Sequence, residues 1–155
     1  MKIYNITDKK SFTTKLFLEE VFDNFLLVEA NFITDFGIYF DGHRTGYEIG
    51  EDEHVTWGIV RNQAFTAIKG SKLPKSFKIV FRLSGANTAN TVRSLGISDV
   101  PDVALYLNIR YNEDRLDMTA GVSTPDFFAS KSIETGWEHY LEKFFMLKDI
   151  SYEEE

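Results

Sequence analysis

The chain has 155 residues, a formal net charge of −7 and 43% apolar residues, among them 14 Phe, and it has no cysteine. This length and composition indicate one folded domain with a real core, and the absence of cysteine excludes disulfides, Cys-ligated zinc and a thiol nucleophile. The N-terminal residues lack the apolar run of a signal peptide, and no stretch approaches the roughly 20 apolar residues of a membrane span, so we expect a soluble, cytoplasmic protein that does not contact a membrane.

The first elements along the chain are a predicted strand and a predicted helix. Residues 2–6 alternate between apolar and polar side chains, which is typical of a half-buried strand. Asp8 stands where an N-cap belongs, ahead of a helix over 9–20 that turns Phe12 and Leu16 toward the core.

A second strand and a hairpin are predicted next. The β-branched and aromatic residues of 25–34 indicate a strand. Asp41-Gly42 lies between two apolar runs, and such a dipeptide favours a tight hairpin turn because both of its residues tolerate positive φ. We therefore expect residues 36–40 to pair with residues 43–49.

The middle of the chain contains the clearest helical pattern. Side chains spaced three and four residues apart predict a helix with one face formed by Trp57, Val60, Arg61, Ala64, Phe65 and Ile68. Gly70 then fits the C′ position that ends a helix, and Pro74 lies just beyond it. We expect this face to pack against the strand that follows.

Strands dominate the second half of the chain until a long last helix. The strand at 76–84 is the clearest, because its side chains alternate between Phe77, Ile79, Phe81 and Leu83 on one face and Lys78, Val80 and Arg82 on the other. The remaining elements are, in chain order, a short helix within 85–102, strands at 103–111 and 116–122 joined by a turn at 112–115, an edge strand at Phe127-Phe128, a helix over 132–148 and a frayed acidic tail over 151–155. We expect the last helix to pack Trp137, Leu141 and Phe145 on the sheet.

These elements predict an α+β fold, in which an antiparallel sheet has its helices on one face. We expect a single domain over residues 1–150. Strand–helix–strand–strand–strand over 2–49 is followed by helix–strand–strand–strand over 56–122, so an alternative form of this fold is a doubled unit of that kind with an added C-terminal helix.

The basic residues are concentrated in one part of the chain. Residues 55–98, the acid-free segment, contain seven Lys and Arg and no Asp or Glu, whereas ten basic and 24 acidic residues lie elsewhere. The net negative charge argues against a general nucleic-acid binder. The acid-free segment leaves two interpretations open, a surface for an anionic partner or ordinary solvated charge.

Four residues of the acid-free segment are the candidate ligand-binding residues: Lys72, Lys75, Lys78 and Arg82. Lys78 and Arg82 are four apart on a strand and so share a face, while Arg61 lies outside this patch on the apolar stripe of its helix. The stretch is not a phosphate loop, because the P-loop motif is absent and because helices bind phosphate at their N-termini, whereas this stretch follows a helix. Such a patch could bind DNA or RNA only weakly, through phosphates, and we expect it instead to be ordinary surface charge.

Motifs for catalysis and metal binding are absent from the sequence. His43, His54 and His139 do not have the spacing of metal ligands, no Gly-x-Ser-x-Gly elbow supports a serine nucleophile, and no glycine-rich dinucleotide loop follows a strand. We therefore expect no catalytic residue, no metal and no cofactor. An enzyme would need a site assembled from residues far apart in the sequence.

Three stretches, FDNFLLVEA, WGIVRNQAFTAIKGSKLPKSFKIVF and GWEHYLEKFFMLKDI, together resemble an uncharacterised family of bacterial proteins classed as a domain of unknown function. The resemblance runs along nearly the whole chain and implies a small cytoplasmic bacterial protein, but it supplies no catalytic or binding residue.

A second similarity concerns architecture. FLLVEANFITDFGIYFDG looks like the first repeated unit of a DNA sliding-clamp domain. Clamps are acidic overall while the helices that line their ring are basic, which matches the acid-free segment. A clamp ring needs several such domains, however, and the terminal helix of this chain has no obvious place in one.

The sequence leaves the function unknown. The favoured hypothesis is a small non-catalytic cytoplasmic binding or interaction domain whose partner is unknown. A protein partner, self-association and a weak nucleic-acid contact all stay open. The alternatives are a nucleic-acid-proximal, clamp-like protein that uses the acid-free segment, and an enzyme with an unrecognised site.

Overall fold

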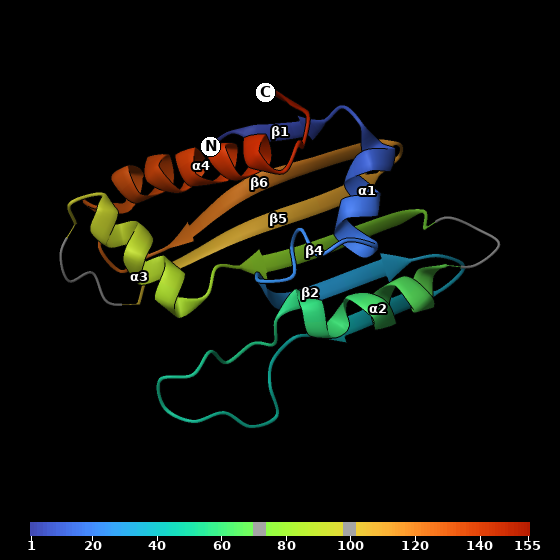
Figure 1. Ribbon diagram of the computed structural model, residues 1–155, viewed down its shortest axis with the longest axis horizontal. Coiled ribbons are helices and arrows are strands. Elements are labelled where there is room, and N and C mark those ends of the chain that lie inside the picture. Colours follow the sequence, from blue (N-terminus) through green and yellow to red (C-terminus); the bar gives the residue numbers. More distant parts are fainter. Residues whose placement is uncertain (70–73, 98–101) are drawn as a thin grey trace.

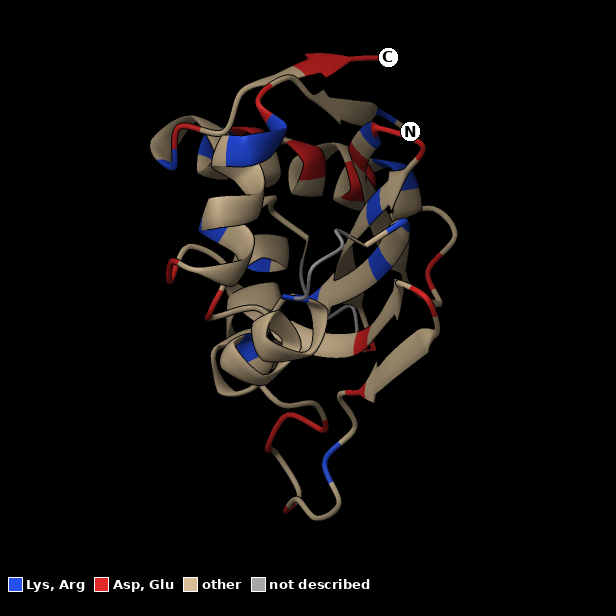
Figure 2. Ribbon diagram, turned by 90° about the vertical axis from the view of Figure 1, so that its right-hand side faces the viewer, with Lys and Arg blue, Asp and Glu red and all other residues tan. Residues whose placement is uncertain are grey.

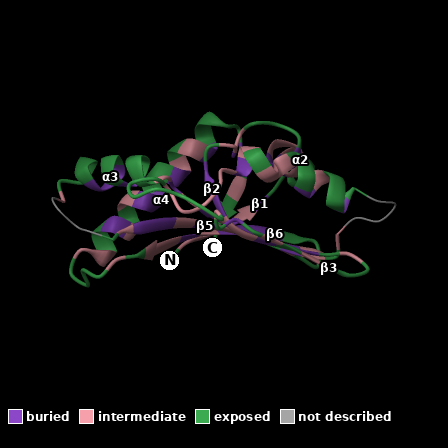
Figure 3. Ribbon diagram, turned by 90° about the horizontal axis from the view of Figure 1, so that it is seen from below, coloured by how far each residue is buried: buried purple, intermediate pink, exposed green. Residues whose placement is uncertain are grey.

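The fold is built on one antiparallel sheet, and the helices lie on one of its faces (Figure 1, Figure 3). The computed structural model describes residues 1–69, 74–97 and 102–155. The elements in these residues are, in chain order, β1 (Ile3–Ile6), α1 (Lys9–Phe17), β2 (Leu26–Ile33), β3 (Gly37–Asp41), α2 (Trp57–Ile68), β4 (Ser76–Arg82), α3 (Gly85–Ser94), β5 (Ala104–Asn112), β6 (Arg115–Ser123), α4 (Ser130–Leu147) and β7 (Tyr152–Glu154).

The strand order in the sheet is β3-β2-β4-β5-β6-β1-β7, and each neighbouring pair is antiparallel. The predicted α+β fold, with an antiparallel sheet and a C-terminal helix, is confirmed. β1 pairs with β6 and β7, so the first strand lies on the far side of the sheet from β2 and β3. The doubled, clamp-like form of the fold stays a prediction.

The apolar face of α2 packs on the sheet, as expected from its spacing. Trp57 is buried, and its ring centroid lies 5.4 Å from that of Phe81 on β4. Ala64 and Ile68 are also buried. Phe65 is only half-buried, because it lies beside a pocket described below.

α4 packs its predicted face on the sheet. Trp137, Leu141 and Phe145 are fully buried, and the indole N–H of Trp137 donates a hydrogen bond to the backbone oxygen of Tyr106 at 2.8 Å. The ring of Phe145 meets that of Tyr4 edge-on, with 5.3 Å between the centroids. The last helix is therefore fixed to β5 and to β1.

The hairpin predicted around Asp41-Gly42 is wrong. β3 pairs with β2, which precedes it, and residues 43–49 belong to a long loop that leaves the body of the fold (Figure 1). Gly42 is a point of close approach, because a Cβ there would lie 1.8 Å from the backbone oxygen of Leu27. The glycine is required where two backbones meet, and not by a turn.

Two further expectations about the C-terminal third are wrong. The acidic tail is not frayed, because Tyr152–Glu154 forms β7 and pairs with the otherwise free edge of β1. Phe127 and Phe128 form no strand: they lie in a turn shaped by the Asp126 carboxylate, which accepts the N–H of Phe128. Gly70, predicted to end α2, lies outside the described residues.

Candidate functional site

In the part of the chain that the structure describes, no helix covers the second face of the sheet, and we call this surface the open face (Figure 3). Side chains alternate along a strand, so residues between the buried positions of each strand lie on this face. The charged and aromatic ones on β4, β5 and β6 are Lys78, Arg82, Tyr106, Arg110, Arg115 and Asp117. In Figure 2 the Lys and Arg bands follow the strands of the sheet.

The four predicted ligand-binding residues are brought together only in part. Lys78 and Arg82 share the open face. Lys75 is exposed just before β4, and its backbone N–H donates to the backbone oxygen of Ile33 at 2.7 Å. Lys72 lies outside the described residues.

Acidic residues from other segments lie beside both cations of the open face that the sequence singled out. Lys78 Nζ is 3.9 Å from Glu29 on β2, and Arg82 Nη1 is 3.4 Å from Glu53 in the loop before α2. The acid-free segment therefore contains no Asp or Glu, but in the folded chain acidic residues from other segments lie beside it. Partly exposed ion pairs at these distances are weak, so neither cation is firmly held.

Arg110 was not among the candidate residues, yet it lies directly opposite Lys78 in the register of β4 and β5. Both side chains are more than half exposed, at 57% for Arg110 and 54% for Lys78. Like charges in opposed positions of neighbouring strands repel. Because side chains alternate along a strand, Arg110 lies on the face opposite to the buried Leu107 and Ile109, but only the strand order brings it beside Lys78.

Asp117 lies beneath two arginines of the open face. Its side chain is 8% exposed, and its carboxylate oxygens are 3.6 Å from Arg110 Nε and 2.9 Å from Arg115 Nε. Hydrogen bonds to Glu155 and Asp117 raise the pKa of Arg115 above its ordinary value. Asp117 thus accepts a hydrogen bond from Arg115 and makes only a longer ion pair with Arg110.

A pocket of about 530 Å³ lies between α1 and α2, and we call it the α1–α2 pocket. The apolar part of its lining includes Phe17, Phe65, Ile68, Phe77, Tyr111 and Leu116. The charged residues of its lining are Lys9, Lys10 and Lys69. A more open groove of about 660 Å³ lies between α3 and α4, where its polar lining includes Asn87, Asn90, His139 and Lys143.

Across residues 1–69, 74–97 and 102–155, no group of three or more His, Asp or Glu side chains is placed to hold a metal ion. His43 and His54 face each other across the long loop, with 5.7 Å between their rings, and burial lowers the pKa of His54. Within the same described ranges, no helix has the length and apolar character needed to cross a membrane.

A family model described as "Family of unknown function (DUF5721)" matches residues 15–153. The chain belongs to this family. The match confirms the predicted resemblance to an uncharacterised domain family. No curated protein and no solved structure matches the chain, and the similarity to a sliding clamp is unconfirmed. The family description names no activity.

Proposed function

We propose that this chain is a non-catalytic binding domain whose open face docks a single-stranded nucleic acid. The observation that carries the proposal is the opposed pair of Lys78 and Arg110, which places two exposed like charges side by side at the centre of the sheet. Their mutual repulsion is relieved when a phosphate lies between them. The cytoplasmic location and bacterial source expected from the sequence are part of the same proposal.

The other side chains of the open face favour nucleic acid over an acidic peptide. Tyr39 is 59% exposed on β3, in the same row of the sheet as Asn31 and Lys78. Tyr106 lies on β5, with the Arg82 guanidinium 6.0 Å from its ring centroid. Rings on a sheet are platforms on which unpaired bases stack, and amide side chains bind the edges of bases.

The acidic surroundings set the expected strength of binding. The chain has a formal net charge of −7, and every cation named here has an acidic neighbour. Binding therefore needs phosphates to displace weak ion pairs. We expect micromolar affinity at best and a steep loss of affinity as the salt concentration rises.

Fluorescence polarisation with a short labelled single strand, in about 50 mM salt, tests the proposal. We expect the double variant Lys78→Gln/Arg110→Gln to bind about tenfold more weakly, and Lys131→Gln on α4 to bind like the unchanged chain. No change in polarisation at tens of micromolar protein would overturn the proposal. Equal competition by polyglutamate would assign the open face to an acidic peptide instead.

A further inference from the structure

We infer that the α1–α2 pocket binds an amphipathic monoanion, such as a carboxylate on a hydrocarbon chain of medium length. The pocket is separate from the open face, and this inference does not rest on the function proposed above. It rests on the walls of the pocket, on the charge around them, and on the hydrogen bonds that its polar groups already make.

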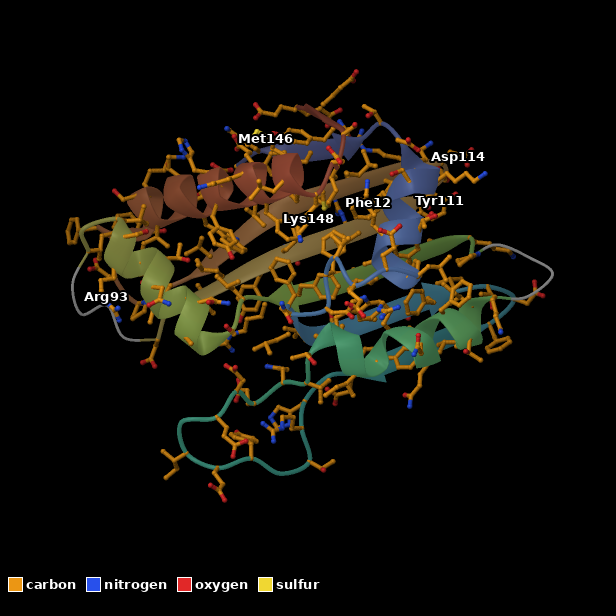
Figure 4. All side chains as sticks on the ribbon, in the orientation of Figure 1. Phe12, Arg93, Tyr111, Asp114, Met146 and Lys148 are labelled. Carbon is orange, nitrogen blue, oxygen red and sulfur yellow. The ribbon has the colours of Figure 1, made fainter. Side chains whose placement is uncertain are left out.

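The walls of the pocket are apolar and belong to the core. The ring of Phe77 lies 5.9 Å from that of Phe17 and 5.4 Å from that of Tyr111, and Figure 4 places Tyr111 beside α1. Ile68 and Leu116 are buried beneath the pocket. A preformed cavity of about 530 Å³ with such walls is of the size that binds small molecules.

The charged groups of the lining are all cationic. Lys9 and Lys10 stand in the first turn of α1, Lys69 follows the end of α2, and all three are exposed. Within residues 1–69, 74–97 and 102–155, none of the three takes part in an ion pair. Among the described residues, no Asp or Glu is part of the lining, although the chain contains 24 acidic residues. Three lysines without an ion-pair partner in the described ranges therefore line an apolar cavity, and the acidic Asp114 beside it accepts a hydrogen bond from the Tyr111 hydroxyl of the lining at 3.4 Å.

The hydroxyl groups of the lining already donate hydrogen bonds within the protein. The hydroxyls of Thr13 and Thr14 donate to backbone oxygens one turn earlier in α1, at 3.0 and 2.9 Å. An anion must therefore be bound by the lysine ammonium groups. Lys69 Nζ lies 6.0 Å from the centroid of the Phe65 ring, so one of these groups stands directly beside the apolar wall.

The two features together select the ligand. Inorganic phosphate would meet the lysines but leave the aromatic walls in water, and a neutral hydrocarbon would fill the cavity without using any cation. A fatty-acid carboxylate satisfies both, with its charged end at the lysines and its chain against Phe17, Phe65 and Phe77. Aromatic sulfonates have the same chemistry and serve as probes for it.

Anilinonaphthalene sulfonate fluorescence with the full chain, followed by competition, tests the inference. We expect a saturable rise in fluorescence that decanoate reverses and that decanol and inorganic phosphate do not. Thermal unfolding recorded on the same sample must be cooperative, because the dye also stains loosely packed states. An unsaturable signal, or equal displacement by decanol, would overturn the inference.

Variants locate the site. Replacing Lys9, Lys10 and Lys69 by Gln should weaken decanoate binding by about tenfold or more, because each lost ammonium removes a charge-assisted hydrogen bond. The matched control replaces three exposed lysines near α4 by Gln, namely Lys131, Lys143 and Lys148. Thr14→Phe keeps every lysine, fills the cavity and should abolish binding. Unchanged affinity in the first variant or in Thr14→Phe, or a loss in the control, would contradict the assignment.

Discussion

Two glycines of the long loop differ in what surrounds them. A Cβ at Gly42 would lie 1.8 Å from the backbone oxygen of Leu27, whereas one at Gly46 would meet nothing within 4 Å. We expect Gly42→Ala to lower the free energy of unfolding by at least about 1 kcal/mol, because the loop must move off β2. Gly46→Ala should change it by less than about 0.5 kcal/mol. Urea unfolding followed by tryptophan fluorescence measures both variants, and equal stabilities would contradict the close approach.

Glu142 is one of the residues through which α4 holds β1, besides Phe145. Its Oε2 accepts hydrogen bonds from the Tyr4 hydroxyl at 2.8 Å and from Lys2 Nζ at 3.0 Å. Burial raises the pKa of the Glu142 carboxyl, but the hydrogen bonds and the charge of Lys2 outweigh burial and hold the pKa below its ordinary value. A pKa that folding lowers contributes stability above the unfolded-state value, and this stability is lost as the pH falls through the folded-state value.

The pH dependence of stability therefore tests this contact. We expect Glu142→Gln to be less stable than the unchanged chain near neutral pH, and to lose less stability as the pH falls below about 4.3. Glu19→Gln, an exposed change after α1, should leave the profile as it is. Urea unfolding at a series of pH values measures all three proteins. Parallel profiles for Glu142→Gln and the unchanged chain would refute the role of Glu142.

At the scale of elements, β7 protects the edge of the sheet. Its register on β1 pairs Tyr4 with Glu154 and Ile6 with Tyr152. An unpaired strand edge is a template for pairing with other chains, and acidic side chains on the last strand discourage such pairing. The tail is thus a structural element of the fold.

Deleting residues 151–155 tests the place of the tail. The N–H groups of Ile3 and Thr7 donate to backbone oxygens of Glu155 and Ser151, and the deletion removes these acceptors. We expect a loss of about 1–3 kcal/mol in the free energy of unfolding and faster amide hydrogen exchange at Ile3 and Thr7. Unchanged exchange at both amides would show that the tail is frayed after all.

Elements with a strong local pattern were predictable from the sequence, and pairings between distant segments were not. The alternation of β4 and the three-and-four spacing of α2 lie within each segment, so burial could be assigned before any partner was known. The pairing of β3 with β2 and of β7 with β1 depends on the strand order of the whole sheet, which no local pattern contains. Asp41-Gly42 has the composition of a turn, and the backbone of Leu27 that it meets is far away in the sequence.

At the scale of the whole molecule, strand order decides which residues form a site. It places Arg110 beside Lys78, and it brings Glu29 and Glu53 against the cations of the acid-free segment. Charge counted along the sequence indicated a basic patch there, whereas the fold places an acidic side chain beside both Lys78 and Arg82. The lysines and aromatic residues that line the α1–α2 pocket come from segments spread between Lys9 and Leu116. No local sequence pattern could therefore predict this pocket.

One NMR titration tests most directly the claim that the molecule carries two separate surfaces for anions. Amide spectra of the isotope-labelled chain are recorded in about 50 mM salt, first with a short single strand and then with decanoate added. The strand should shift amides of β4 and β5 around Lys78 and Arg110, and decanoate should shift a second, separate set around Lys10 and Lys69. Shifts that do not saturate for either ligand, or one common set for both, would contradict the claim.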